Sequence, residues 1–185
     1  MKKLHALGLA ISAALCIPLA AQADDGRIIF QGALTGQTCT IGPNGGSFTV
    51  TLPTITTANL KGAPYAGATN FSIELTNCPS GINSFVTFFE AAANVDLANG
   101  KLKNTNTGTG AATNVEIALT NADETPIDLT KPTTMQGVQS VPIASSGPST
   151  AHFIAKYFDN SPVGSTTGPT VGSVRSYVDY SLVYN

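Results

Sequence analysis

Few side chains in this sequence have the types and spacing that acid–base or nucleophilic chemistry requires. His152 is the only histidine after the N-terminal segment, and it lies in the apolar run from Ala151 to Tyr157. That pattern favours a structural role, because a catalytic base needs a nucleophile within hydrogen-bond reach. Ser145, Ser146 and Ser149 are near in sequence, but no nucleophile-elbow motif surrounds them. The sequence therefore predicts no catalytic residue, and a small hydrolase is a disfavoured alternative.

Acidic residues gather at one place in the chain. Asp123, Glu124 and Asp128 flank Thr125-Pro126, but they lack the regular spacing of a calcium-binding loop. No glycine-rich motif for phosphate or dinucleotide binding occurs. We interpret the acidic residues as a solvated turn, and expect no metal site and no cofactor.

The N-terminus has the order of a secretory signal peptide. Lys2 and Lys3 precede the apolar run Ala6 to Leu19, and a small-x-small cleavage site follows at Ala21 to Ala23. We therefore expect residues 1–23 to be removed before Asp24. The run is short for a membrane span, and no later segment approaches the necessary length.

Two cysteines remain after this cleavage. Cys16 leaves with the signal peptide, whereas Cys39 and Cys78 stay as an even pair in an exported chain. Export implies an oxidising compartment, so a disulfide is expected. Closing a loop of about 40 residues stabilises a fold by about 4 kcal/mol on the chain-entropy model.

The charge balance is weakly acidic. The formal net charge is −2, and without Lys2 and Lys3 it is about −4. No basic cluster provides the electrostatic surface that a nucleic-acid partner needs. Polarity comes largely from Thr, Ser, Asn and Gly, as in proteins that pack against copies of themselves outside the cell.

Apolar residues recur with a period of two, which indicates half-buried strands. Turn pairs such as Asn99-Gly100 separate the runs, and neither an internal repeat nor a domain linker is visible. Many short strands with frequent turns predict an all-β sandwich. The runs are Phe48–Leu52, Phe71–Leu75, Phe85–Phe89, Val115–Leu119, His152–Phe158 and Val178–Tyr184.

The segment after the cleavage site has an interrupted apolar face. Ile28, Phe30 and Leu34 share one phase, and Gly32 falls in the same phase. A glycine within a strand weakens it or marks the close approach of another backbone. An ordinary first strand with a bulge is the alternative interpretation.

These features together resemble the subunits of chaperone–usher fimbriae, of the type 1 and P-pilus kind. The resemblance covers essentially the whole chain after the signal peptide. It rests on the apolar alternation through Phe30 and on the penultimate Tyr184. It also rests on the positions of the cysteines, since Cys39 follows the N-terminal segment at a short distance and Cys78 follows a predicted strand. It also rests on Gly172, which is fourteenth from the C-terminus.

The resemblance implies an immunoglobulin-like sandwich that lacks its last strand and is completed by donor-strand exchange. It divides the chain into a signal peptide (1–23), an N-terminal donor-strand extension (24–36) and a pilin domain (37–185). It also implies a periplasmic chaperone, an outer-membrane usher and identical or related fimbrial subunits as partners. The protein would travel through the periplasm to a fimbria on the cell surface.

Residue roles follow from the same resemblance. The donor strand would present Ile28, Phe30, Gly32 and Leu34 to a neighbour. The acceptor groove and chaperone-contact strand would comprise Gly172, Val178, Tyr180, Leu182, Tyr184 and Asn185. The carboxylate of Asn185 would anchor in basic residues of the chaperone, and the disulfide between Cys39 and Cys78 would hold the unfinished fold together.

The subunit's place in the filament has two interpretations. A major rod subunit is favoured, and it would have to accept its own donor strand. The alternative is a minor adaptor or tip subunit, or a small adhesin that binds a host glycan or protein.

Overall fold

The computed structural model describes residues 29–32, 38–42, 46–61, 63–164 and 166–185. The chain divides into two units, Met1–Thr35 and Gly36–Asn185. The predicted signal peptide, residues 1–23, lies outside the described residues. The helices and strands described below all belong to the second unit.

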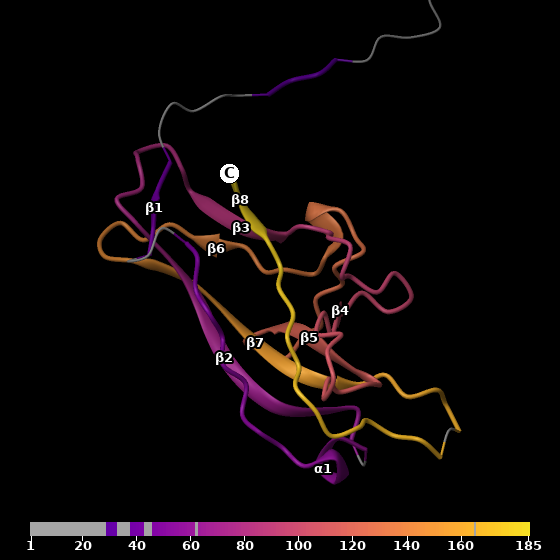
Figure 1. The fold of residues 1–185 in the computed structure, drawn as a ribbon. Coiled ribbons are helices and arrows are strands. Elements are labelled where there is room, and N and C mark those ends of the chain that lie inside the picture. The colour runs from indigo at the N-terminus through magenta and orange to yellow at the C-terminus, as the bar shows by residue number, and fades with distance from the viewer. Residues whose placement is uncertain (1–28, 33–37, 43–45, 62, 165) are drawn as a thin grey trace, which may run out of the picture. The chain divides into compact units, whose positions relative to one another are not determined.

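The larger sheet is antiparallel and has the strand order β1-β2-β7-β5-β4. Its two long strands, β2 and β7, lie side by side at its centre (Figure 1) and pair from Tyr65↔Phe158 to Leu75↔Ser149. The strands are β1 (Thr40–Ile41), β2 (Tyr65–Thr76), β4 (Leu102–Lys103), β5 (Val115–Asn121) and β7 (Ser149–Asp159).

The smaller sheet has the order β6-β3-β8, with β3 (Ser84–Phe89) at its centre. β6 (Val141–Pro142) covers the beginning of one edge of β3, and β8 (Tyr180–Tyr184) runs along the whole of the other edge. The C-terminal segment reaches β3 after crossing the molecule from the end of β7 (Figure 1).

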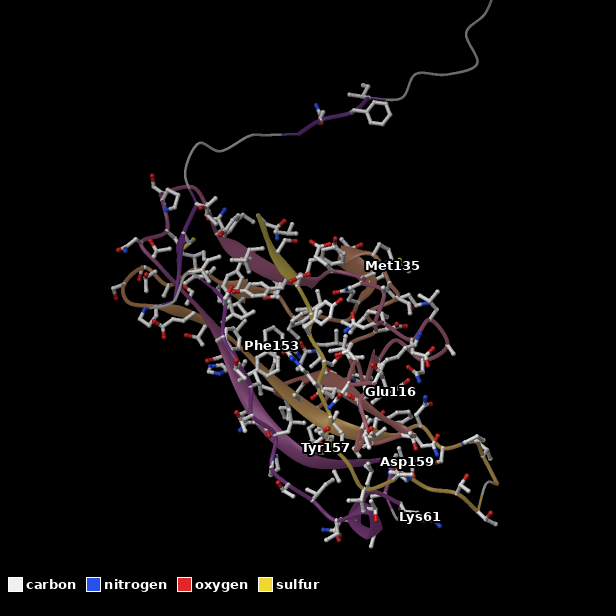
Figure 2. The ribbon with its side chains drawn as sticks, viewed as in Figure 1. Lys61, Glu116, Met135, Phe153, Tyr157 and Asp159 are labelled. Atoms are coloured by element: carbon white, nitrogen blue, oxygen red, sulfur yellow. A yellow bond between two sulfur atoms is a disulfide. The ribbon has the colours of Figure 1, made fainter. Side chains whose placement is uncertain are left out.

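The two sheets pack face to face over one apolar core. Phe89 on β3 meets Phe153 on β7 edge to face, with ring centroids 5.2 Å apart, and Phe153 points inward in Figure 2. The predicted all-β sandwich is confirmed. Buried side chains in this core include Ile73, Leu75, Phe85, Phe89, Leu119, Leu129 and Phe153.

Most predicted strands are present, but the strand predicted at Phe48–Leu52 is not. This run has apolar alternation, and Val50 and Leu52 pack against the core, yet the structure assigns it no strand. Alternation requires only one buried face, whereas a strand also requires a hydrogen-bonded neighbour. Within the described chain this segment has no such neighbour. Two short helices, α1 (Thr57–Lys61) and η1 (Thr133–Met135), complete the described elements.

The amide side chain of Gln136 closes part of the second edge of β3. It is 1% exposed and donates from Nε2 to the Phe89 carbonyl at 2.7 Å, while its Oε1 accepts from the Phe89 N–H at 3.1 Å. This pair of bonds copies the pattern that a neighbouring strand would make. Beyond the reach of β6, Gln136 therefore satisfies backbone groups that burial would otherwise penalise.

Candidate functional site

The last strand, β8, has a free edge. Within the described chain it pairs only with β3, at the end of the smaller sheet. Hydrogen bonds between Ser84 and Asn185, and from Glu90 to Asp179, fix the phase of this ladder. Alternate N–H and C=O groups therefore point away from β3. They belong to Tyr180, Leu182 and Tyr184.

The side chains of these residues face the core. The core-facing set is Val178, Tyr180, Leu182 and Tyr184, all half-buried, and the residues between them are exposed. Burial raises the pKa of the Tyr180 and Tyr184 hydroxyls, although a hydrogen bond from the Cys39 backbone opposes this in Tyr184. An apolar strip that is incompletely covered, next to unpaired backbone groups, is a template for another strand.

The segment Gly46–Ile55 meets the C-terminal part of the chain at two places. The Tyr180 hydroxyl donates to the Gly46 carbonyl at 2.8 Å, and Ile55 shares a small apolar cluster with Val174 in the C-terminal segment. Among the described residues, the backbone of Ser47 to Ile55 makes no hydrogen bond to another backbone group. We call the free edge of β8 together with Gly46–Ile55 the seam.

The predicted donor residues are only partly described. Ile28 and Leu34 lie outside the described residues, as does most of the predicted extension 24–36. Ile29 to Gly32 form no strand, and the side chains of Ile29 and Phe30 are 72% and 89% exposed. Phe30 is thus a large, exposed apolar side chain in the first unit.

Gly172 lies where two backbones approach closely. Ser173 pairs with Ala111, and its N–H donates to the Gly110 carbonyl at 2.8 Å. A Cβ at Gly172 would lie 2.4 Å from the Ala112 nitrogen and 2.5 Å from the Gly110 oxygen. Glycine is therefore required for space, and this close approach anchors the chain that leads to β8.

Gly172→Ala is expected to lower the free energy of unfolding by about 1–3 kcal/mol, because backbone atoms must shift to admit the methyl group. Urea denaturation of the wild-type chain and of the variant measures the difference in the free energy of unfolding. Gly108→Ala is the matched control, since its Cβ would meet only the Asn106 side chain, at 3.6 Å. An equal loss of unfolding free energy in the two variants would show that the close backbone approach at Gly172 does not require glycine.

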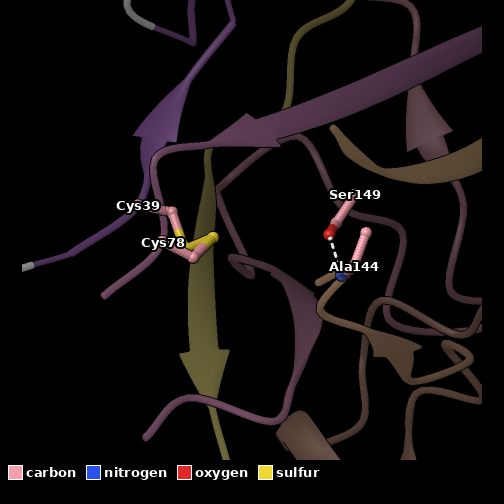
Figure 3. The surroundings of a disulfide bond; sticks show 4 residues. All are labelled: Cys39, Cys78, Ala144 and Ser149. Atoms are coloured by element: carbon pink, nitrogen blue, oxygen red, sulfur yellow. Dashed lines mark hydrogen bonds between the residues drawn. A yellow bond between two sulfur atoms is a disulfide. The ribbon is translucent and has the colours of Figure 1, made fainter. Parts of the chain in front are cut away.

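The predicted disulfide is present between Cys39 and Cys78 (Figure 3). Cys39 immediately precedes β1 and Cys78 follows β2, whose ends pair through Thr40↔Thr76. The bond therefore fixes the short strand β1 to the long strand β2. Next to it, the Ser149 hydroxyl accepts a hydrogen bond from the Ala144 N–H at 2.8 Å.

The C-terminus continues the ladder between β8 and β3. The N–H of Asn185 donates to the Ser84 carbonyl at 2.9 Å, and its terminal oxygen accepts from Asn83 and Ser84. In the described chain, this oxygen of Asn185 is therefore held by β3.

The histidine and the acidic residues for which the sequence predicts no catalytic or metal-binding role are exposed or engaged in local contacts. His152 is exposed on β7, opposite Ser72 of β2. Asp123 accepts hydrogen bonds from Thr125, which lower the pKa of its carboxyl. Glu124 pairs with Lys156 at 3.2 Å. The described residues contain no group of acidic, histidine or cysteine side chains that could hold a metal ion.

Two sites join residues far apart in sequence, and no local pattern predicted them. One is the bridge from Tyr180 to Gly46, whose only sequence signal is the glycine itself. The other is Glu116 on β5 (Figure 2), which is buried and accepts hydrogen bonds from the side chains of Asn99 and Asn160, each at 2.8 Å. Burial raises the pKa of the Glu116 carboxyl. This cluster joins two loops to β5.

No described helix is long and apolar enough to span a membrane.

Comparison with known proteins gives consistent results. The family model for type-1 fimbrial protein, A, matches residues 52–185. The major fimbrial subunit SMF-1 of Stenotrophomonas maltophilia is 38% identical, over 91% of this chain and 97% of that protein. The F17 fimbrial protein of Escherichia coli is 34% identical, over 86% of this chain and 87% of that protein.

Two solved structures share the fold. The P pilus rod subunit PapA superposes with a TM-score of 0.59 at 18% identity, covering 80% of this chain and 100% of that chain. A chaperone-usher pilus structure superposes with a TM-score of 0.58 at 17% identity, covering 91% of this chain and 100% of that chain. The fold is thus the incomplete immunoglobulin-like sandwich of these pilins, as the resemblance implied. The chain belongs to the type-1 fimbrial protein family and is a structural subunit, not an enzyme, that assembles with other subunits into a surface pilus.

Proposed function

We propose that this chain is a rod-forming subunit of a chaperone–usher fimbria, and that its N-terminal strand completes the sandwich of the next subunit. The free edge of β8 carries the proposal. Among the described residues, Tyr180, Leu182 and Tyr184 combine unpaired backbone groups with half-buried core-facing side chains. An added strand satisfies both at once, through main-chain hydrogen bonds and through apolar side chains that cover the core.

The proposed donor has matching chemistry. Ile28, Phe30 and Leu34 share one phase, with Gly32 between the last two. Burying one such side chain stabilises by about 1.5–3 kcal/mol. The side chain of Phe30 is 89% exposed, and a neighbour's seam would bury it.

This arrangement produces a filament. The donor segment and the seam are different surfaces, so the contact is heterologous and each added subunit exposes a new seam. Before assembly, a periplasmic chaperone would cover the same edge, and the outer-membrane usher would exchange it for the incoming donor strand. In the chaperone-bound subunit, basic residues would take the Asn185 carboxylate.

The major role is supported by the 38% identity to a protein described as a major fimbrial subunit. A rod subunit must accept the donor strand of an identical copy, whereas a minor subunit need not. Self-assembly of the purified chain therefore separates the two roles.

The purified chain from Asp24 to Asn185 is expected to form filaments visible by negative-stain electron microscopy. Phe30→Glu should abolish them, because a carboxylate cannot enter an apolar core without a large desolvation cost. Ile29→Glu is the matched control, since Ile29 is similarly exposed but lies in the opposite phase. Filaments formed equally by Phe30→Glu would refute the donor role, and a wild-type chain that stays monomeric would assign it a minor role.

A further inference from the structure

A cavity of 340 Å³ lies beside the disulfide, between the end of β2 and the loop that leads to β7. Its walls are Thr76–Cys78 and Ile143–Ser149. The hydroxyl of Ser149, which is 4% exposed, accepts a hydrogen bond from the Ala144 N–H at 2.8 Å and so ties the two ends of this loop together (Figure 3). Of the two cysteines, it is Cys78 that lines the cavity.

The two halves of the disulfide differ in burial. Cys39 is 5% exposed and belongs to the apolar core together with Leu75 and Phe85. Its backbone N–H donates to the Tyr184 hydroxyl. Cys78 is half-buried and packs against this core. A thiol in solution therefore reaches Cys78 through the cavity, whereas it reaches Cys39 only if the core opens.

Access helps to decide which sulfur a thiol attacks in thiol–disulfide exchange, together with the acidity of the thiol that leaves. The attacking thiolate approaches one Sγ atom from the side away from the other. Burial in apolar surroundings makes Cys39 a poor leaving group, because its thiolate is poorly solvated there. This slows the exchange but opens no path to the Cys39 sulfur itself.

We infer that Cys78 is the exchange site of the folded chain for thiols that enter this cavity. The external thiolate attacks the Cys78 Sγ atom, a new S–S bond forms there, and the bond to Cys39 breaks. The electron pair of the broken bond stays on the Cys39 sulfur, which takes a proton from water. The inference concerns the disulfide alone and does not depend on strand addition.

A second external thiolate completes the reaction by attacking the external sulfur of the mixed disulfide. Cys78 then leaves as a thiolate and takes a proton, and the two external thiols leave as one disulfide. They are oxidised by two electrons while the protein disulfide is reduced by two. Until then Cys39 can re-attack Cys78 and restore the original bond, so the mixed disulfide must be trapped early.

Peptide mapping tests the assignment. The oxidised chain from Asp24 to Asn185 is treated briefly with glutathione, and excess N-ethylmaleimide then stops the exchange and marks the released cysteine. Mass spectrometry of the digested chain should find at least about ten times more glutathione on Cys78 than on Cys39, because attack on Cys39 must wait for a local opening of the core.

The same mapping in concentrated urea is the control. Both sulfurs are accessible in the unfolded chain, so the two cysteines should carry about equal amounts of glutathione. Glutathione found equally on both cysteines of the folded chain, or mainly on Cys39, would overturn the inference.

A charge beside the cavity tests the route of entry. Glutathione is anionic at neutral pH and attacks as a thiolate, so Ser146→Lys should raise the initial rate of its incorporation and Ser146→Glu should lower it. Each change is expected to be about twofold, the effect of one charge several ångströms away in water. Ser146 is exposed in the loop, so neither variant disturbs the core.

Ser72→Lys and Ser72→Glu are the matched controls for charge. Ser72 is also exposed but lies on β2 opposite His152, and both rates should equal that of the wild-type chain. Rates that stay unchanged in both Ser146 variants would overturn entry through this cavity.

Discussion

A peptide of Asp24 to Thr38 is expected to raise the melting temperature of the Phe30→Glu chain by about 10 °C when it is present at a thousandfold its dissociation constant. The chain carrying Phe30→Glu keeps its seam but loses its donor. The peptide supplies backbone partners for Tyr180, Leu182 and Tyr184 and covers the apolar strip behind them. Only the folded state offers this site, so binding stabilises it by mass action.

Differential scanning calorimetry measures the shift, and its dependence on peptide concentration gives the dissociation constant. A peptide with Phe30 replaced by Glu is the control and should leave the melting temperature unchanged. If the wild-type peptide does not change the melting temperature, either the sandwich is already complete or the seam binds the strand of a different subunit. Repeating the scan with extensions of other subunits distinguishes these two cases.

The second large effect concerns the disulfide. The double variant Cys39→Ala/Cys78→Ala is expected to lose about 4 kcal/mol of unfolding free energy, because the closed loop spans 39 residues. For a domain of this size the melting temperature should fall by roughly 10 °C. The large effect has a structural reason: β1 is two residues long and pairs with β2 alone among the described strands.

Thermal unfolding monitored by circular dichroism tests this prediction. Dithiothreitol should lower the melting temperature of the wild-type chain to the same extent and should not affect the double variant. A melting temperature within about 2 °C of the oxidised wild type would show that the bond contributes little, and that the contacts of β1 with β2 suffice.

Local patterns predicted most of the sandwich. The alternations at Phe71–Leu75 and Val178–Tyr184 lie in or next to β2 and β8, because each has one face in the core. The alternation at Val115–Leu119 lies in β5, which is buried on both faces. The cysteine count gave the disulfide for a similarly simple reason: only one pairing remained. Phe48–Leu52 shows the limit of such patterns, since alternation reports a buried face but not the presence of a neighbouring strand.

The residues of the seam illustrate the same limit. Periodicity placed Tyr180, Leu182 and Tyr184 on one face, and the ladder with β3 then showed that their backbone groups point outward. No local pattern links Tyr180 to Gly46, or Gln136 to Phe89, because these contacts join residues far apart in sequence. They depend on how the sheets and loops pack, which a single sequence does not reveal.

The two hydrogen bonds between the Gln136 side chain and the Phe89 backbone have a consequence for the shape of any polymer. β3 lies between β8 and β6, and Gln136 occupies the backbone groups of Phe89 that β6 does not reach. At Phe89 this edge of β3 is therefore already hydrogen-bonded, whereas β8 leaves its outer edge unpaired within the described chain. In the language of polymer chemistry, the proposed strand addition at β8 would give the monomer an acceptor valence of one at this sheet, and a single donor segment would then yield unbranched chains.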